Sequence, residues 1–276
     1  MTKLPNLLKD IRLKKPLIHH MTNQVTMNFL ANGILAAGGS PMMAHHYEEA
    51  EEAVMAADAL ILNIGTVEPD LVKGMILAGK KAKSSEIPVV LDPVGAGLSS
   101  LRKTAVSEII DEVSPNVICG NAAEIAFLSG EQWSGKGVDG SLAEDSSELA
   151  RFAANQLNCL VSITGKEDIL SDGAETMVIR GGHEMLSYVT GTGCLSTSLI
   201  GLFLAKSVTT DLTSFERMAG ALTYLGLCAE RAVSAARGPG SFQTAFLDEL
   251  YLLSAEELDE TGRWETVHGG KSNEQS

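Results

Sequence analysis

Cysteine is sparse in this chain, and the few residues present form no recognisable pairing. The four cysteines are Cys119, Cys159, Cys194 and Cys228. None belongs to a Cys-x-x-Cys pair, which argues against zinc-binding and thiol-redox motifs. The six histidines include two adjacent pairs, and none has the i, i+4 spacing of a helical zinc site. These features predict a reduced, cytoplasmic protein without a disulfide framework.

Basic residues, aromatic residues and long apolar runs are also in short supply. Lys and Arg number 21 against 35 Asp and Glu, and the formal net charge of −14 disfavours nucleic acid as a partner. The longest apolar stretch, Cys194 to Ala205, is too short to cross a bilayer and is interrupted by Ser and Thr, so we expect no membrane association. Aromatic residues make up only 5% of a chain that is 45% hydrophobic, which favours a layered α/β protein over a β-sandwich.

What the sequence does contain is an alternation of short apolar runs with helical segments. The apolar runs predict strands at residues 17–20, 40–44, 59–64, 88–91, 116–119 and 159–164. The helices expected between them make this a series of parallel β-α-β units, followed by an antiparallel pair within residues 168–180. Ligands bind at the carboxyl ends of strands in such sheets, and Met43, Gly65, Asp92 and Asn121 all fall at those ends.

The stretch Val189 to Leu204 (VTGTGCLSTSLIGLFL) predicts a glycine turn that runs into an apolar helix. Gly191 and Gly193 allow a positive φ or a close approach to a ligand. A helix start offers unpaired backbone N–H groups and binds anions readily. Cys194 lies at this start, where the field of the helix is expected to lower the pKa of the thiol. The alternative is a strand-to-helix turn with a buried, inert cysteine.

Two further turns carry candidate ligands for Mg²⁺. Asp92 begins the turn DPVGAG after an apolar run, where it would hold the ion directly or through water. The alternative is an ordinary Asp-Pro turn. Asn121 and Glu124 lie on one face of a helix start, where they would order a hydrated Mg²⁺ and the phosphates it bridges. The alternative is a capping box, in which Asn121 caps the helix and Glu124 reaches back.

The common nucleotide-binding motifs are missing or misplaced. A dinucleotide fingerprint, G-x-G-x-x-G, would follow the first strand, where this chain has Gly38-Gly39 instead. The tail segment Gly270-Lys271-Ser272 has the ending of a P-loop, but Glu265 occupies the position of the first glycine. Any phosphate site must therefore be of another kind.

Five segments together resemble the hydroxyethylthiazole kinases of thiamine biosynthesis and salvage, in which they occur in the same order. They are PLIHHMTNQVTMNFLANGILAAGGSPMMA, ILNIGT, VVLDPVGAG, GNAAE and VTGTGC. The resemblance spans roughly residues 14–245. It implies a three-layer ribokinase-like α/β fold, with a central, mostly parallel sheet flanked by helices, and a homotrimer. It also implies transfer of the γ-phosphoryl group of ATP, with Mg²⁺, to the primary hydroxyl of 4-methyl-5-(2-hydroxyethyl)thiazole.

The resemblance also implies a role for each matching position. The catalytic residue would be Cys194, and the metal residues would be Asp92 and Glu124. The thiazole would be contacted by Asn23, Met43 and Gly191, and ATP by Cys119, Asn121, Thr164 and Gly193. Cys119 departs from the family pattern, which usually has a basic residue at that position.

Other functions stay open from the sequence alone. Within the same fold they are a kinase for hydroxymethylpyrimidine or pyridoxal, and an ATP-dependent NAD(P)H-hydrate dehydratase. A sensor that binds the thiazole or a nucleotide without turnover is a further alternative. For the chain as a whole we expect a single kinase domain over residues 1–258. A disordered tail is expected over residues 259–276, because that segment is polar and contains glycine.

Overall fold

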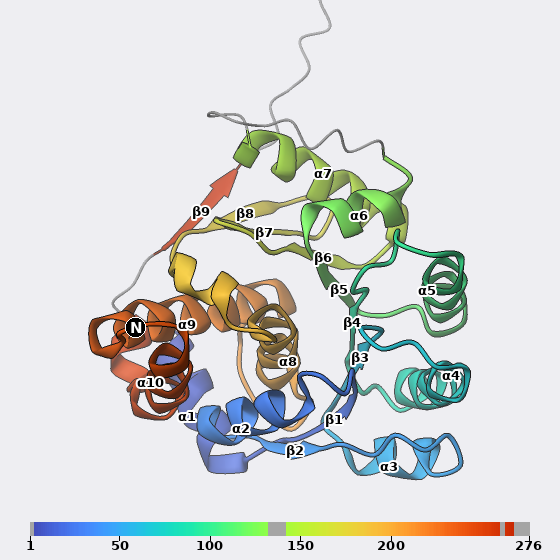
Figure 1. The fold of residues 1–276 in the computed structure, drawn as a ribbon, viewed down its shortest axis with the longest axis horizontal. Coiled ribbons are helices and arrows are strands. Elements are labelled where there is room, and N and C mark those ends of the chain that lie inside the picture. The colour runs from blue at the N-terminus through green and yellow to red at the C-terminus, as the bar shows by residue number, and fades with distance from the viewer. Residues whose placement is uncertain (1–2, 132–141, 260–262, 268–276) are drawn as a thin grey trace, which may run out of the picture.

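The computed structural model describes residues 3–131, 142–259 and 263–267, and a nine-stranded sheet forms the centre of this part of the chain (Figure 1). The strand order is β2-β1-β3-β4-β5-β6-β7-β8-β9. Pairing is parallel from β2 to β6 and antiparallel from β6 to β9, so the prediction of a mostly parallel sheet is confirmed. The strands are β1 Leu17–Met21, β2 Ser40–Met42, β3 Ala59–Asn63, β4 Val89–Asp92, β5 Val117–Gly120, β6 Leu160–Ile163, β7 Asp168–Ser171, β8 Thr176–Ile179 and β9 Trp264–Val267.

Helices cover both faces of the sheet and complete the three layers (Figure 1). One face is covered by α3 Ala50–Ala56, α4 Pro69–Ser84, α5 Ser100–Val113, α6 Ala122–Ser129 and α7 Leu142–Leu157. The other is covered by α1 Leu4–Lys14, α2 Met27–Ala37, α8 Thr192–Leu204, α9 Ser214–Ala235, α10 Pro239–Leu252 and α11 Ala255–Asp259. A 3₁₀ helix, η1 Glu184–Tyr188, precedes α8.

Two hydrophobic cores lie on opposite sides of the sheet, and strand β3 contributes to both. Ala59 and Ile61 belong to the core beneath α8, whereas Leu60 and Leu62 belong to the core beneath α4 and α5. Successive side chains of a strand point to opposite faces, so a strand buried on both faces must be apolar throughout. This is why the central strands could be found as continuous apolar runs.

The end of the chain differs from the prediction. Trp264–Val267 form β9, which pairs with β8, whereas a disordered tail was expected there. The indole N–H of Trp264 donates to Thr223 Oγ1 at 2.7 Å, and Arg263 pairs with Glu230. These partners lie far away in the sequence, so the polar composition of the tail gave no sign of them. Residues 260–262 and 268–276 lie outside the described residues.

The helix α10 begins at Pro239, although glycines stand on both sides of this residue. Proline is tolerated in the first turn of a helix because the N–H it lacks would have no partner there. Among the described residues, no helix combines the length and the apolar character that crossing a membrane requires.

Candidate functional site

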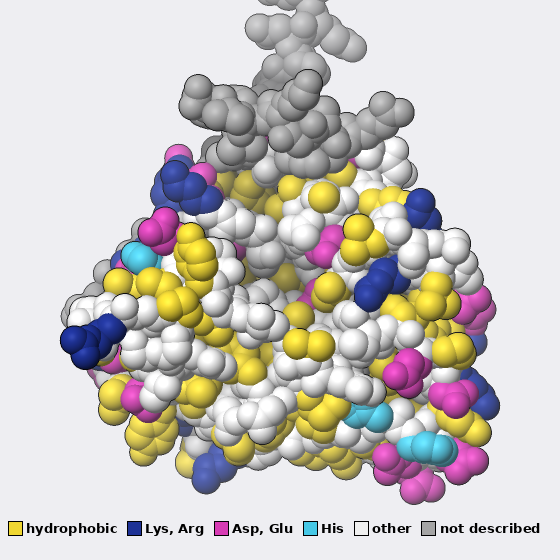
Figure 2. Space-filling model, viewed as in Figure 1, with side chains coloured by type: hydrophobic (Ala, Val, Ile, Leu, Met, Phe, Trp, Pro, Cys, Tyr) yellow, Lys and Arg dark blue, Asp and Glu magenta, His cyan; other side chains and the backbone are white. Residues whose placement is uncertain are grey.

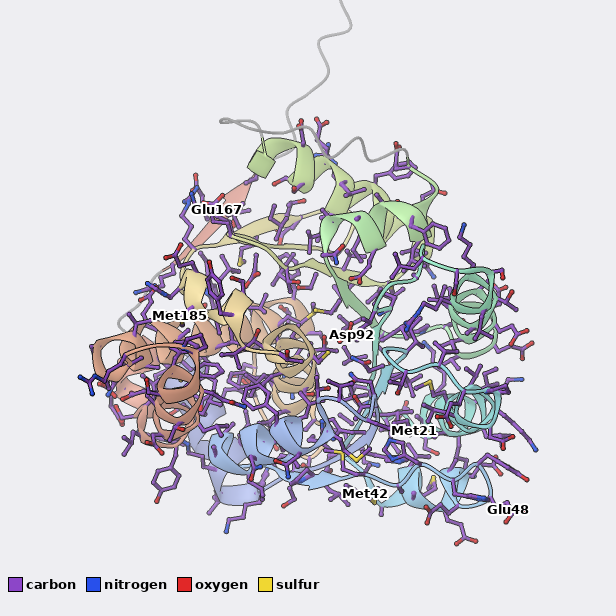
Figure 3. The ribbon with its side chains drawn as sticks, viewed as in Figure 1. Met21, Met42, Glu48, Asp92, Glu167 and Met185 are labelled. Carbon is purple, nitrogen blue, oxygen red and sulfur yellow. The ribbon has the colours of Figure 1, made fainter. Side chains whose placement is uncertain are left out.

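The predicted site residues gather at the edge of the sheet where the parallel strands end. The register places Asn63, the last residue of β3, beside Asp92, the last residue of β4. Asp92 lies near the middle of the molecule, between α8 and the helices α4 and α5 (Figure 3). The face of the molecule shown in Figure 2 is hollowed near its centre, and acidic side chains are visible in the hollow. The expectation that a ligand site forms at the carboxyl ends of the strands therefore agrees with the shape of this face.

Four side chains at this edge form one hydrogen-bonded network, which we call the strand-end network: Asn23, Asn63, Asp92 and Cys194. Asn63 Nδ2 donates to Asp92 Oδ2 at 2.6 Å and to Cys194 Sγ at 3.2 Å. Asn23 Nδ2 donates to Asn63 Oδ1 at 3.0 Å and to Cys194 Sγ at 3.7 Å. The structure thus brings together one predicted substrate residue, one predicted metal residue and the predicted catalytic residue.

Asn63 was missed from the sequence, although a signal was present. It is the polar residue in the apolar run ALILNI, and it is the last residue of its strand. The position that drew attention to Asp92 is the same one, at the end of the neighbouring strand. A polar side chain that ends a fully buried strand at the ligand edge is a site candidate on that ground alone.

Asp92 is buried beside another acidic group. Burial raises the pKa of its carboxyl to about 7, and the negative charge of Glu124 acts in the same direction. Hydrogen bonds from Cys194, Thr197 and Asn63 oppose this rise. A carboxylate that is desolvated and close to a like charge is stabilised by a bound cation.

The Cys194 thiol contradicts the expectation drawn from the helix start. Burial, followed by the charge of Asp92, raises the pKa of Cys194 to about 12, whereas a lowered pKa was expected. The third residue of α8 is partly covered and faces a carboxylate, and both effects disfavour the thiolate more strongly than the helix field favours it. At neutral pH this cysteine is therefore a thiol.

Asn121 and Glu124 form the capping box of α6. Asn121 Oδ1 accepts from the backbone N–H of Glu124 at 3.0 Å, and Glu124 Oε2 accepts from that of Asn121 at 2.9 Å. Glu124 Oε1 also accepts from the backbone N–H of Gly95 at 2.8 Å, in the turn that follows Asp92. The capping alternative is therefore correct. It leaves the metal role possible, because each carboxylate oxygen keeps a second lone pair.

Asp92 and Glu124 fit a magnesium ion better than a metal held by protein alone. Among the residues that the structure describes, no group of three or more His, Cys, Asp or Glu side chains is placed to hold a metal. Mg²⁺ keeps most of its waters and is bound through one or two carboxylates together with substrate phosphates. Two acidic groups that interact electrostatically at the strand ends suit such an ion.

The glycine turn before α8 packs against the segment that carries Asn23. Gly191 has a φ of +94°, and a Cβ atom there would lie 2.9 Å from Thr26 Cγ2 and 3.1 Å from Phe29 Cδ1. Only glycine combines this backbone conformation with so close an approach. The turn leaves the first N–H groups of α8, including that of Gly193, without partners within the helix, as an anion site requires.

A cavity of about 850 Å³ adjoins the start of α8. Its lining includes two of the predicted ATP residues, Thr164 and Gly193, together with Asp168 and Arg180. The Thr164 backbone N–H donates to the carbonyl of Gly120 at 2.9 Å, which fixes the end of β6 beside β5. Burial raises the pKa of Asp168 to about 7. A cavity of this size accommodates a molecule as large as a nucleotide.

Two of the residues predicted to contact ligands, Met43 and Cys119, are not part of the strand-end network. Met43 is partly buried just beyond β2, and its carbonyl accepts a hydrogen bond from the His45 ring at 2.7 Å. The Cys119 side chain has no exposed surface and lies in the core beneath α8. Burial raises the pKa of its thiol to about 12. Contact between Cys119 and ATP stays a prediction, and the burial of the thiol disfavours it.

Arg102, which the sequence analysis did not single out, joins the two turns at the strand ends. Its guanidinium donates to the carbonyls of Ile64 at 2.6 Å, Val94 at 2.7 Å and Gly65 at 2.8 Å. The first and third of these carbonyls follow β3, and the second follows β4. Arg102 therefore holds the backbone beside Asn63 in place relative to the backbone beside Asp92.

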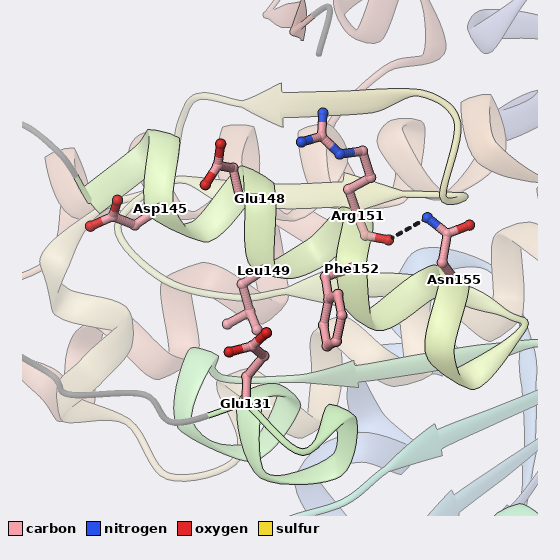
Figure 4. Close-up of a pocket in the computed structure, with 7 residues that line it drawn as sticks. All are labelled: Glu131, Asp145, Glu148, Leu149, Arg151, Phe152 and Asn155. Carbon is pink, nitrogen blue, oxygen red and sulfur yellow. Dashed lines mark hydrogen bonds between the residues drawn. The ribbon is translucent and has the colours of Figure 1, made fainter. Parts of the chain in front are cut away.

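A second hollow, of about 520 Å³, contains none of the predicted site residues (Figure 4). It lies between Glu131, at the end of α6, and the face of α7 that carries Leu149 and Phe152. The carbonyl of Arg151 accepts from Asn155 Nδ2 at 3.0 Å, which is an ordinary contact within a helix. We assign no function to this hollow.

Several solved structures of other proteins have the same fold as this chain. A hydroxyethylthiazole kinase from Pyrococcus horikoshii matches with a TM-score of 0.87 and 37% identity, over 96% of this chain and 99% of that one. A ribokinase-like superfamily protein from Enterococcus faecalis matches with a TM-score of 0.64 and 13% identity, over 88% of each chain. The pyridoxal kinase from Staphylococcus aureus in complex with ADP matches with a TM-score of 0.59 and 17% identity, over 79% of this chain and 88% of that one. The last two show the fold alone, and with it the ribokinase-like fold is confirmed.

Several families of proteins share this fold, and a match to a family model shows to which of them the chain belongs. The model of the hydroxyethylthiazole kinase family matches residues 8–256, which include every residue of the strand-end network and the whole cavity lining. This match and the close agreement with the Pyrococcus horikoshii enzyme concern the same part of the chain. On both grounds, the chain belongs to the hydroxyethylthiazole kinase family.

Proposed function

We propose that this chain transfers the γ-phosphoryl group of ATP to the primary hydroxyl of 4-methyl-5-(2-hydroxyethyl)thiazole, in thiamine biosynthesis or salvage. The observation that carries the proposal is the strand-end network beside the nucleotide-sized cavity. In that network Asn63 binds both Asp92 and Cys194. Gly193, adjacent to Cys194 in the chain, lines the cavity. An acceptor and a donor could therefore meet at the start of α8.

The cavity is the proposed ATP site. Thr164 and Gly193 line it, and Asn121 begins the helix beside the predicted metal residues. Asp92 and Glu124 would hold Mg²⁺, which supplies positive charge against the triphosphate. The unpaired N–H groups at the start of α8 would receive the transferred phosphoryl group, because they are fixed donors in a partly covered site.

The acceptor alcohol is proposed to bind on the other side of Cys194. Asn23 would contact the thiazole, Met43 would supply an apolar surface, and Gly191 would allow the ring to approach the backbone closely. The Cys194 thiol is protonated at neutral pH and would orient the hydroxyl rather than remove its proton beforehand. Phosphoryl transfer has a loose transition state, so positioning and charge neutralisation outweigh the strength of a base.

Mass spectrometry of the thiazole after incubation with the protein and ATP tests this function. The expected product has gained one phosphate, in the presence of Mg²⁺ and not after chelation with EDTA. Pyridoxal and hydroxymethylpyrimidine, offered in parallel, should gain phosphate far more slowly. Binding of the thiazole without any phosphorylated product would indicate a sensor, and phosphate on a different acceptor would change the substrate.

The assembly and location of the protein are separate proposals. A homotrimer is supported by the family resemblance and by exposed apolar side chains such as Val25, Leu35 and Leu98. Light scattering coupled to size-exclusion chromatography would give a mass three times that of the chain. A cytoplasmic location rests on the sequence features described above, and fractionation of cells expressing the protein would test it.

A further inference from the structure

Asn63 contacts all three other members of the strand-end network through its amide group. Its Nδ2 donates to Asp92 and to Cys194, and its Oδ1 accepts from Asn23 Nδ2 at 3.0 Å. The same oxygen accepts the backbone N–H of Gly65 at 2.9 Å. A primary amide has two N–H donors and two acceptor lone pairs, so every hydrogen-bonding position of Asn63 is used.

The orientation of this amide follows from its neighbours. Exchanging its oxygen and nitrogen would place the oxygen against the Asp92 carboxylate and the NH₂ group against the N–H of Gly65. The second contact would set two donors against each other whatever the protonation of Asp92, so the Gly65 N–H selects the orientation described. Asn63 is 1% exposed, so a bond lost there leaves a buried polar group without its partner.

We propose that Asn63 is a positioning residue, which fixes the Asp92 carboxylate relative to the Cys194 thiol and holds Asn23 in register with both. The proposal rests on the proposed function, since it assigns Asn63 a part in the same reaction. The two halves of the amide do different work. The NH₂ half aligns the metal residue with the catalytic residue, and the oxygen half aligns the substrate residue.

Two substitutions separate these halves. Asn63→Ala removes all four hydrogen bonds. Asn63→Asp keeps an oxygen for Asn23 and Gly65 but loses both donors and adds a second negative charge beside Asp92. A small misplacement of reacting groups costs about 100-fold in rate, and we expect a loss of kcat of about that size in both variants. KM for the thiazole should rise in Asn63→Ala and stay near the wild-type value in Asn63→Asp. KM for ATP should stay near the wild-type value in Asn63→Ala, which changes no charge.

Asn116→Ala is the matched control. Asn116 Oδ1 accepts the backbone N–H of Val89 at 2.9 Å, but it does so at the opposite edge of the sheet, where β4 and β5 begin. This variant should keep the wild-type kcat. Thermal unfolding and circular dichroism would establish that each variant is folded, and if one Asn63 variant fails to fold, kcat of the other decides. A folded Asn63 variant whose kcat stays within a few-fold of wild type would overturn the proposal.

A failure of the proposed function can be distinguished from a failure of the positioning role of Asn63. If the wild-type protein phosphorylates no thiazole, that function is wrong, whatever Asn63 does. Crystal structures of the wild-type protein and of Asn63→Ala then decide the positioning role. It requires the separation of Asp92 Oδ2 and Cys194 Sγ to change in the variant, and an unchanged separation refutes it.

Discussion

Glu124 Oε1 accepts the backbone N–H of Gly95 at 2.8 Å, so the helix start of α6 and the turn after Asp92 are tied together by one carboxylate. Gly95 has a φ of +66°, and the bond stabilises this left-handed turn. The charge of Glu124 also reaches Asp92, whose pKa it helps to raise. A single side chain therefore shapes the turn, caps the helix and contributes to the electrostatics of the proposed metal site.

Neutralising this carboxylate should weaken the binding of Mg²⁺. Glu124→Gln removes the charge and keeps an oxygen for only one of the two backbone N–H groups, that of Gly95 or that of Asn121. We expect the Mg²⁺ concentration for half-maximal activity to rise by about 10- to 100-fold, as for other residues that organise metal ligands. Titration of activity with Mg²⁺ measures this. The control is Glu131→Gln, on the exposed residue that follows the same helix, and an equal shift in both variants would count against the metal role.

Removal of the Cys194 thiol should impair transfer without abolishing it. A general base contributes roughly 10²–10⁴-fold to a rate. Because the Cys194 thiol is protonated at neutral pH, we expect kcat of Cys194→Ala to fall by less than about 100-fold. Cys194→Ser should recover part of the loss by orienting the acceptor hydroxyl. Cys159→Ala, on a cysteine away from the site, should behave as wild type. Turnover of Cys194→Ala at the uncatalysed rate would show that the thiol does far more than orient.

Arg102 should contribute to stability as well as to activity. Arg102→Ala leaves three carbonyls without their donor. Hydrogen bonds to a charged group contribute about 1.5–3 kcal/mol each, so the free energy of unfolding should fall by at least about 2 kcal/mol. The turns that carry Asn63 and Asp92 lose their common anchor, and kcat should fall in parallel. Urea unfolding and steady-state kinetics test both effects. Lys103→Ala, at the next position of α5, is the control, and it should change neither quantity by as much.

His20 should make the fold sensitive to acid. It lies fully buried in β1, its Nδ1 contacts the carbonyl of Ile18 at 3.0 Å, and its Nε2 has no hydrogen-bond partner in the described part of the chain. Burial lowers the pKa of His20 from 6.5 to about 3. At neutral pH the imidazole is uncharged in both states. As the pH falls below 6.5, the unfolded chain binds a proton at His20 that the folded chain does not, so the contribution of this residue to stability is lost progressively down to about pH 3.

The measurement is the free energy of unfolding in urea at pH 7.5 and at pH 5.5. The raised pKa values of Asp92 and Asp168 make stability rise over the same interval in both proteins. The prediction therefore concerns the difference: on going from pH 7.5 to pH 5.5 the free energy of unfolding of His20→Gln should change in the stabilising direction relative to that of the wild type, because its side chain does not titrate. The neighbouring His19, whose pKa burial also lowers, is still present in the variant, so part of the pH dependence of the free energy of unfolding remains. His46→Gln, on an exposed histidine, should retain the wild-type slope. Equal slopes in wild type and His20→Gln would contradict the prediction.

The fold was predictable largely because of its buried strands. β3 and β4 carry side chains into two cores, so they are apolar up to their last residues, Asn63 and Asp92. The glycine turn before α8 follows from local residue preferences and was found correctly. The strand β9 was missed because its stability depends on pairing with β8 and on Trp264, contacts with residues distant in the sequence.

The site was predictable in its location and less so in its electrostatics. Position at the strand ends identified Asp92, and the capping box of Asn121 and Glu124, given as the alternative to a metal role, is present in the structure. The pKa of Cys194 was predicted in the wrong direction, because burial and the Asp92 charge depend on tertiary packing. Arg102 escaped notice for the same reason, because its importance lies in bonds between segments that no single stretch of sequence reveals. Asn63 could have been found from its position as the polar last residue of a buried strand.

The position of β9 affects whether the edge of the sheet can pair with strands of other chains. All four residues of β8 are buried, and β9 covers the edge that this strand would otherwise expose. An open edge offers unpaired N–H and C=O groups to any neighbouring strand, and an apolar one is a site of aggregation. The two outer strands are poor templates, since β9 exposes Glu265 and the three-residue β2 contains Pro41. A short polar segment at the end of the chain thus protects the sheet from pairing with copies of itself.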